Sequence, residues 1–219
     1  MIKPVLFNTE EVKATLDGRK TAKRLVVKPP YFVDTPGTPM PMRSAPKGSY
    51  VYRQVGTMPY PEFIYNPGDI LYVRETFAEL CRTDENGYTH YDESFYLYAA
   101  DNPQIDLYDA NGFLLDDQRI KWKPSIHMPK AAARIFLRVT DVRIKKLQDM
   151  YLVDFIREGV QLTDKYESNL VTQGICARHA FIDIWNSTLK KDSDCTWMHN
   201  PWVWVIEFER ISKEDAYNV

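Results

Sequence analysis

Two clusters of basic side chains in this sequence suggest a site that binds anions. Arg19, Lys23 and Arg24 follow the end of a predicted helix. A second cluster of the same sign comes about a hundred residues later, at Lys121, Lys123, Lys130 and Arg134. Arginine holds a phosphate with two hydrogen bonds, so both clusters suit the backbone of a nucleic acid. The alternative is that cations are stable at a helix C-terminus and need no ligand.

A loop bounded by Pro124 and Pro129 adds polar and aromatic candidates. Ser125 and His127 lie on this loop, where side chains can be fixed without joining a strand ladder. The imidazole can titrate, stack on a base or hydrogen-bond to it, or it can be an ordinary structural group. Trp122 stands between two lysines and is predicted to be exposed and to stack on a base. The histidines share no metal-ligand spacing, so we predict no metal and no cofactor.

A short helix must position the first basic cluster. Asn8 is a good N-cap, Glu11 stands three residues on as in a capping box, and Gly18 follows the last turn. This helix is predicted over about 9–17. The basic residues then lead into the apolar strand 25–27.

Apolar periodicity predicts the remaining elements. Strands are expected in three segments: 70–73, 133–144 and 202–208. In the second of these Ile135, Leu137 and Val139 face inward. One later helix ends at Glu158-Gly159, and a longer one covers about 175–190. These pieces predict an α+β fold, a small mixed β-barrel with a few peripheral helices.

Two long insertions are predicted within a single domain that spans residues 1–219. The first covers about 28–66; nine of the fourteen prolines lie from Pro29 to Pro67, which excludes a regular helix there. The second covers about 78–120 and is acidic and rich in tyrosine.

The net charge of −2 hides a strong segregation of charge along the chain. Residues 1–66 carry a net +5, residues 67–118 a net −10, residues 119–146 a net +8 and the remainder a net −5. The two basic segments can form one positive face beside an acidic flap. Alternatively, these charges only solvate different edges of the barrel.

Cysteine usage and the N-terminus bear on the cell compartment. The three cysteines, at positions 81, 176 and 195, include no CxxC pair, so neither a disulfide framework nor a zinc knuckle is expected. The first residues lack an apolar signal core, and the longest apolar run is far too short for a bilayer. We predict a cytoplasmic protein without a membrane partner, in the host cytoplasm if it is phage-encoded.

Several short motifs occur in a distinctive order. Gly-Arg-Lys-Thr stands at 18–21 after the capped helix, Pro-Gly-Asp-Ile-Leu at 67–71, and a closing strand at 203–210. Together they resemble the ASCH domain, a branch of the PUA-like β-barrels. Three further segments are similar to the longer phage and prophage members: 72–76, 122–129 and 200–202. The resemblance covers nearly the whole chain outside the two insertions.

This resemblance implies a site and a ligand class. PUA-like barrels bind RNA or flipped, modified bases in a cleft beside the barrel mouth. Some small ASCH members are amidohydrolases that deacetylate acetylcytidine, and others are ribonucleases. The amidohydrolase pattern assigns its lysine to Lys20 and its glutamate to Glu158. Its threonine falls on Lys23, so Thr21 is the nearest hydroxyl on offer. The alternative for Lys20 and Glu158 is a structural ion pair.

Three hypotheses follow. The leading one is a module that binds RNA, single-stranded nucleic acid or a modified nucleoside through a basic cleft at the barrel mouth. The second is an amidohydrolase or ribonuclease in the same cleft. The third is a phage protein-interaction module, with a protein partner on the acidic insertion.

Overall fold

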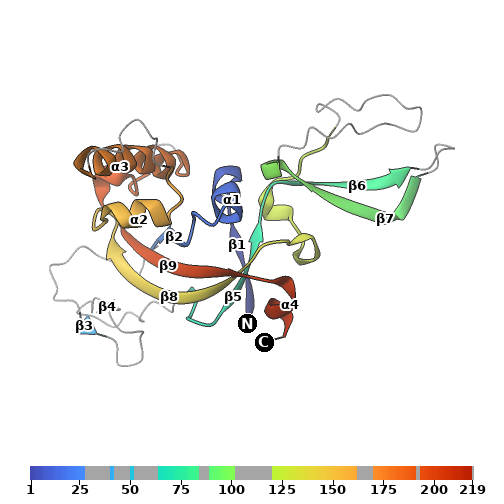
Figure 1. The fold of residues 1–219 in the computed structure, drawn as a ribbon, viewed down its shortest axis with the longest axis horizontal. Coiled ribbons are helices and arrows are strands. Elements are labelled where there is room, and N and C mark those ends of the chain that lie inside the picture. The colour runs from blue at the N-terminus through green and yellow to red at the C-terminus, as the bar shows by residue number, and fades with distance from the viewer. Residues whose placement is uncertain are drawn as a thin grey trace.

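The computed structural model is a mixed α+β protein built on one long, curved sheet (Figure 1). It describes residues 1–27, 40–41, 50–51, 64–83, 89–101, 120–161, 170–190 and 193–218. The first predicted insertion, 28–66, lies mostly outside these residues, as does the 102–119 part of the second. In the described parts of the chain, no helix is both long enough and apolar enough to cross a membrane.

Five strands form the main sheet, in the order β1-β5-β8-β9-β2. Their bounds are Ile2–Leu6 for β1, Ile70–Arg74 for β5, Phe136–Lys146 for β8, Trp202–Ile211 for β9 and Ala22–Val26 for β2. β1 pairs in parallel with β5, and the other neighbours are antiparallel. A register shift between Val139 and Asp141 marks a bulge, a feature that bends the bulged strand.

The sheet is open, so the predicted barrel closure is not confirmed. β1 and β2 are its two edge strands, and no pairing joins them within the described residues. The strands themselves are close to prediction. β8 begins at Phe136 rather than at residue 133, because a 3₁₀ turn at Lys130–Ala132 precedes it.

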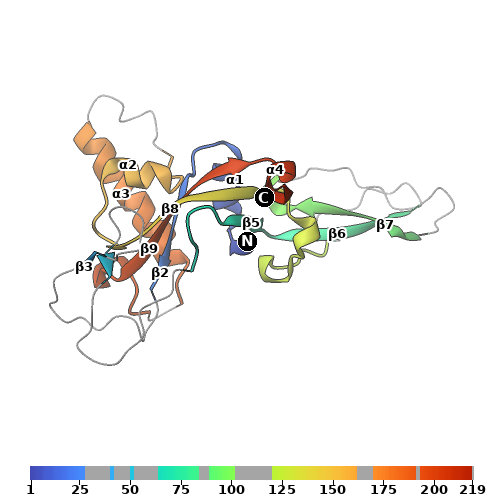
Figure 2. The ribbon, with the colours of Figure 1, turned by 90° about the horizontal axis from the view of Figure 1, so that it is seen from below.

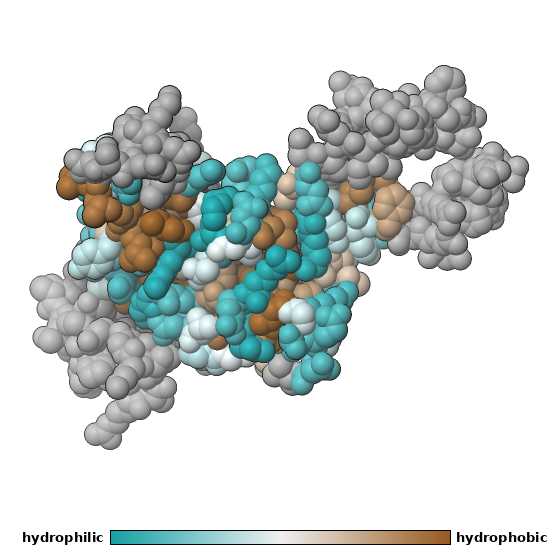
Figure 3. Space-filling view, viewed as in Figure 1, coloured by the Kyte–Doolittle hydropathy of each residue, from teal (hydrophilic) through white to brown (hydrophobic). Residues whose placement is uncertain are grey.

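Helices cover both faces of the sheet. α1 (Thr9–Leu16) packs with Trp204, Ile206 and Phe208 of β9 on one face. α2 (Leu152–Arg157) and α3 (Leu170–Ser187) pack against Val203 and Val205 on the other face. Alternate residues of β9 thus enter different cores, which explains why the first half of this strand, residues 202–206, is apolar without a break. Exposed apolar groups gather over α2 and α3 (Figure 3, brown, upper left).

The remaining elements are small. A hairpin of β6 (Phe77–Thr83) and β7 (Thr89–Tyr98) projects from the end of the sheet away from α2 and α3 (Figures 1 and 2). α4 (Lys213–Tyr217) follows β9, and β3 (Met40–Pro41) pairs with β4 (Tyr50–Val51). Arg134 fixes the hairpin by donating to both carboxylate oxygens of the buried Glu75 and to Asp101.

Candidate functional site

The capped helix predicted from the sequence leads directly into the site. The Asn8 side chain accepts from the Glu11 backbone at 2.8 Å, and Glu11 Oε2 accepts from the Asn8 backbone at 3.0 Å, which confirms the capping box. Gly18 has a φ of +75° at the helix end. The chain then folds back, since the Lys20 amide donates to the Ala14 carbonyl at 2.9 Å. This turn places Lys20 next to Glu11 of α1.

A second helix end presents Glu158 to Lys20. The Gly159 amide donates to the Ile156 carbonyl and the Val160 amide to the Phe155 carbonyl, the two bonds of a Schellman motif. Gly159 takes a φ of +93°, as that motif requires. The helix therefore ends where the sequence predicts. Lys20 and Glu158 form an isolated antiparallel bridge, although 138 residues separate them.

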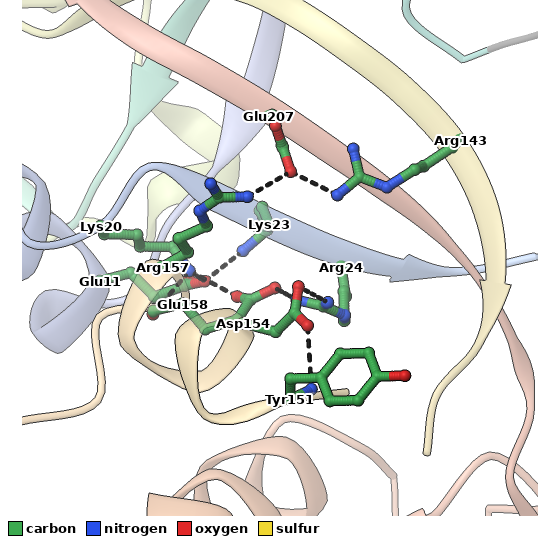
Figure 4. A network of polar contacts seen from close by, with 10 residues as sticks. All are labelled: Glu11, Lys20, Lys23, Arg24, Arg143, Tyr151, Asp154, Arg157, Glu158 and Glu207. Carbon is green, nitrogen blue, oxygen red and sulfur yellow. Dashed lines mark hydrogen bonds and ion pairs between the residues drawn. The ribbon is translucent and has the colours of Figure 1, made fainter. Parts of the chain in front are cut away.

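Six charged side chains of alternating sign form a continuous series at this junction, which we call the ion chain (Figure 4). In order along the series they are Lys23, Glu11, Lys20, Glu158, Arg24 and Asp154. The side chains of Lys20 and Arg24 are only 1% exposed. Buried charges persist when each meets an opposite charge, and this arrangement meets that condition.

Three of the five contacts within the ion chain have the short distances of charge-assisted hydrogen bonds, and the other two are longer. Lys23 Nζ lies 2.6 Å from Glu11 Oε1, and Lys20 Nζ lies 3.4 Å from the same oxygen. Lys20 Nζ is 2.8 Å from Glu158 Oε2, while Arg24 donates to Glu158 Oε1 at 2.8 Å. Arg24 also donates to Asp154 Oδ1 at 3.2 Å.

The ion chain passes around the edge strand β2. Lys23 lies opposite Ile206 and Arg24 opposite Val205 in the strand register, so the two side chains leave on opposite faces of the sheet. Lys23 meets α1 on one face, and Arg24 meets α2 on the other. Outside the ion chain, Glu207 accepts hydrogen bonds from both Arg157 and Arg143 (Figure 4).

A pocket of about 280 Å³ lies beside the ion chain at the edge of β2. Its polar floor is made of Glu11, Lys20, Lys23, Arg24 and Glu158. Its apolar side chains come from β1, β2, the segment after α2, and α3 with the residues that follow it: Leu6, Leu25, Val26, Val160, Phe181, Ile184, Trp185 and Leu189. The ion chain contains three cations and three carboxylates, so the charges beside this pocket balance. The pocket is therefore not the basic cleft predicted from the sequence.

Burial and neighbouring charge shift two pKa values in the pocket. Burial would raise the pKa of Glu11, but the ammonium groups of Lys23 and Lys20 outweigh it and hold that pKa below its ordinary value. Burial lowers the pKa of Lys23 despite the opposing attraction of Glu11. The Lys23 ammonium therefore loses its proton more readily than that of a surface lysine, and Glu11 stays ionised to a lower pH than a free glutamate.

The remaining residues of the first basic segment lie outside the pocket. Arg19 donates to the Gly159 carbonyl at 2.7 Å and to Asp17 at 2.9 Å, which ties the two helix ends together. Thr21 is exposed; its amide donates to the Arg157 carbonyl and its carbonyl accepts from Phe208. Neither residue lines the pocket.

The second basic cluster is not brought to this pocket. Lys123 pairs with Glu79 at 3.0 Å and lies over the Phe77 ring, at the start of the β6–β7 hairpin. Ser125 and His127 form a 3₁₀ turn in the same region, and His127 is exposed. Trp122 is half-buried against a small cluster that includes Ala78, Leu97 and Ile120, so the prediction of an exposed stacking ring is wrong.

Sequence reasoning missed three contributors to the site. Glu11 was assigned only to the capping box, although its second oxygen binds Lys23. Asp154 belongs to no recognisable sequence motif. Trp185 fits the apolar spacing of a helix, which does not tell a side chain in the core from one in the wall of a pocket. The signal that points to Glu11 is a carboxylate on the helix that directly precedes a Lys-x-x-Lys-Arg string. Within the described residues, no group of three or more His, Cys, Asp or Glu side chains is arranged to hold a metal.

Comparison of this chain with models of known protein families, with curated proteins and with solved structures found no match.

We expect acid to remove the contribution of Glu11 to stability. Because its pKa in the folded protein is lowered, that contribution is complete above its ordinary value of 4.5 and is lost as the pH falls through the folded value. Glu11→Gln should cost about 2 kcal/mol at pH 7. The difference from wild type should shrink below pH 4.5, because protonated Glu11 resembles glutamine. Urea unfolding from pH 7 to pH 3 measures this.

Glu10→Gln is the matched control for that experiment. Glu10 stands beside Glu11 on α1, but its side chain is exposed and, among the described residues, pairs only with Lys13. Its replacement should change stability by less than about 0.5 kcal/mol at pH 7. A difference between Glu11→Gln and wild type that stays constant down to pH 3 would contradict the assignment.

Proposed function

We propose that this protein binds a single nucleobase, as a modified nucleoside or as a base turned out of an RNA strand, in the pocket at the edge of β2. The observation that carries this proposal is the composition of the pocket, which has a charged floor and an apolar, partly aromatic wall. A base has hydrogen-bonding edges and apolar faces, so it needs both. A volume of about 280 Å³ suits one base with its sugar rather than a length of strand.

The proposal includes a PUA-like arrangement of the sheet, which the resemblance in the sequence predicts. Its support is that both edge strands contribute to the same pocket, β1 through Leu6 and β2 through its last four residues. The sheet therefore bends far enough for its two edges to border one site. The motif residues Lys20 and Glu158 lie at that place and are in contact.

Hydrolysis of an acylated base is the second candidate, and two observations favour it. Lys20 and Glu158 are 2.8 Å apart in the pocket, and the pKa of Lys23 is lowered. A lysine with a lowered pKa is a better nucleophile. However, attack by Lys23 Nζ on an acetyl amide would leave the acetyl group on that nitrogen as another amide. This product is as resistant to water as the substrate, so the reaction would stop after one event.

The carboxylate of the pair is also poorly placed to activate water. Glu158 Oε1 accepts from Arg24 and Oε2 from Lys20, so both oxygens are already engaged by cations. The remaining hydroxyl candidate, Thr21, lies outside the pocket. Binding without turnover is therefore the better supported function. A ribonuclease is less well supported, because the pocket has room for a base but not for a strand on both sides of a scissile bond.

Calorimetric titration with a panel of ordinary and modified ribonucleosides tests the proposal, and Ile184→Glu supplies its variant. Ile184 lines the pocket and is 42% exposed, so a glutamate there enters the site without disturbing the core. We expect this variant to bind nucleosides at least tenfold more weakly. We expect acetylcytidine incubated with the wild type to remain acetylated.

Ile175→Glu is the matched control, because Ile175 stands on the same helix, is 51% exposed and does not line the pocket. It should bind as the wild type does. Equal losses in both variants, or no binding of any nucleoside to the wild type, would contradict the proposal. Repeated turnover of acetylcytidine would identify the protein as an enzyme.

A further inference from the structure

β2 is an edge strand, and every second residue along it points its backbone groups away from the sheet. The Val27 amide donates to the Trp202 carbonyl, and the Thr21 carbonyl accepts from the Phe208 amide, both at 2.9 Å. In this register the odd-numbered residues of β2 bond to β9, so the amide and the carbonyl of Val26 point to the open edge. Within the described part of the chain, neither group has a hydrogen-bond partner.

The pocket lies at this open edge rather than on one face of the sheet. Side chains alternate along a strand, so Lys23 and Leu25 belong to the face that carries α1, while Arg24 and Val26 belong to the face that carries α2 and α3. All four residues line the same pocket. A space bordered by both faces of a strand includes the edge between them. Val26 is also half-buried rather than buried, so its backbone groups are open to a molecule in the pocket.

The open part of this edge is short. At its start, the Thr21 amide donates to the Arg157 carbonyl at 2.8 Å, and Lys20 forms its bridge with Glu158. Among the described residues, the stretch 24–26 therefore remains to present its backbone to the pocket, a length of about 10 Å at the rise of a strand. A peptide that adds a strand to a sheet usually pairs over more residues than this. One flat ring fits the available length better.

An amide beside a carbonyl is a donor next to an acceptor. The Watson–Crick edge of a base carries the complementary arrangement: in uracil, the N–H at ring position 3 stands beside the carbonyl at position 4. A flat ring that pairs with the strand edge continues the plane of the sheet. Its two faces then meet the two sides of the pocket, with Leu25 on one side and Ile184 and Trp185 on the other.

We propose that the main chain of Val26 recognises the Watson–Crick edge of the base, with its amide as donor and its carbonyl as acceptor. The inference rests on the proposed function and names the ligand class: an unpaired base whose Watson–Crick edge is unmodified. A base within a duplex, or one methylated on that edge, lacks the groups that Val26 needs. A modification elsewhere on the ring leaves them available.

The first arm of the experiment changes one methyl group on the ligand. Uridine is titrated by calorimetry beside 3-methyluridine and 5-methyluridine. Each analogue carries one additional methyl group, but only the one at position 3 replaces the N–H of the Watson–Crick edge. We expect 3-methyluridine to bind at least tenfold more weakly than uridine, because a buried acceptor loses its donor. We expect 5-methyluridine to bind within about threefold of uridine.

The second arm removes the amide of Val26. Proline is accepted in an edge strand where the missing N–H faces outward, so Val26→Pro deletes a donor that the sheet does not use. Val26→Ala is its matched control, since it also shortens the side chain but keeps the amide. Uridine should bind Val26→Pro about tenfold more weakly than Val26→Ala, the loss of one hydrogen bond. A folded Val26→Pro that binds uridine as tightly as Val26→Ala does would overturn the inference.

The ligand arm decides the matter even if Val26→Pro does not fold. Equal binding of uridine and 3-methyluridine to the wild type, or equal losses with the two methyl analogues, overturns the inference and leaves the pocket as a nucleobase site that reads another feature. If no nucleoside of the panel binds, the proposed function fails as well. If none binds and a valine-rich pentapeptide does, the edge adds a peptide strand, and both proposals are wrong.

Discussion

Replacing Glu158 by alanine is expected to lower the free energy of unfolding by about 3–5 kcal/mol. The glutamate neutralises two side chains, Lys20 and Arg24, that are each 1% exposed. Among the described residues, removing it leaves both cations buried with Glu11 and Asp154 as their remaining carboxylate partners, at longer distances of 3.4 and 3.2 Å, and Lys20 with the backbone carbonyl of residue 158 at 3.0 Å. Urea unfolding followed by tryptophan fluorescence measures the loss.

Glu209→Ala provides the matched control for Glu158→Ala. Glu209 also pairs with an arginine, Arg138 at 3.2 Å, but these side chains are 55% and 40% exposed. Breaking such a surface pair should cost less than about 1 kcal/mol. Similar losses in the two variants would show that the ion chain is not the buried network described above.

Gly159→Ala is the second substitution with a large expected effect, about 2–4 kcal/mol. Gly159 has a φ of +93°, which an alanine adopts only with strain. Its added Cβ would also stand 2.8 Å from the Cβ of Ala14 and 3.3 Å from that of Lys20. These neighbours are parts of the main scaffold rather than flexible ends, so α1 and α2 must move apart. The movement should also separate Lys20 from Glu158 and weaken nucleoside binding.

Gly18→Ala separates backbone strain from steric contact. Gly18 also has a positive φ, +75°, but no atom of the described part of the chain lies within 4 Å of an added Cβ. Its replacement should cost about 1 kcal/mol and leave nucleoside binding unchanged. Equal stability of the Gly159 and Gly18 variants would be inconsistent with the close approach of the two helices.

Local signals in the sequence predicted local structure well. The Asn8 capping box, the helix end at Glu158-Gly159 and the buried face of β8 all depend on residues a few positions apart, whose chemistry acts within one turn or strand. The order of strands in the sheet has no such local signature. The apolar run at 70–73 indicates a strand, but it does not say that β1 pairs beside it or that the sheet remains open.

The candidate site was predicted in part, for the same reason. Lys20, Lys23, Arg24 and Glu158 were identified as candidates and lie together. The two basic clusters were expected to meet because they share a sign, yet like charges provide no attraction. Each basic residue found in the pocket contacts a carboxylate from another element instead. The prediction that Trp122 is exposed depends on its two lysine neighbours in sequence. The hairpin residues that cover it come from earlier in the chain.

The bridge between Lys20 and Glu158 also has a consequence for the order of folding. It closes a loop of 138 residues, and the entropy lost in closing a loop rises with its length. Contacts between distant parts of a chain are slow to form, so we expect this junction to form late in folding. The pocket does not exist before that stage. A molecule that occupies it should therefore slow the unfolding of the protein while leaving the rate of folding unchanged.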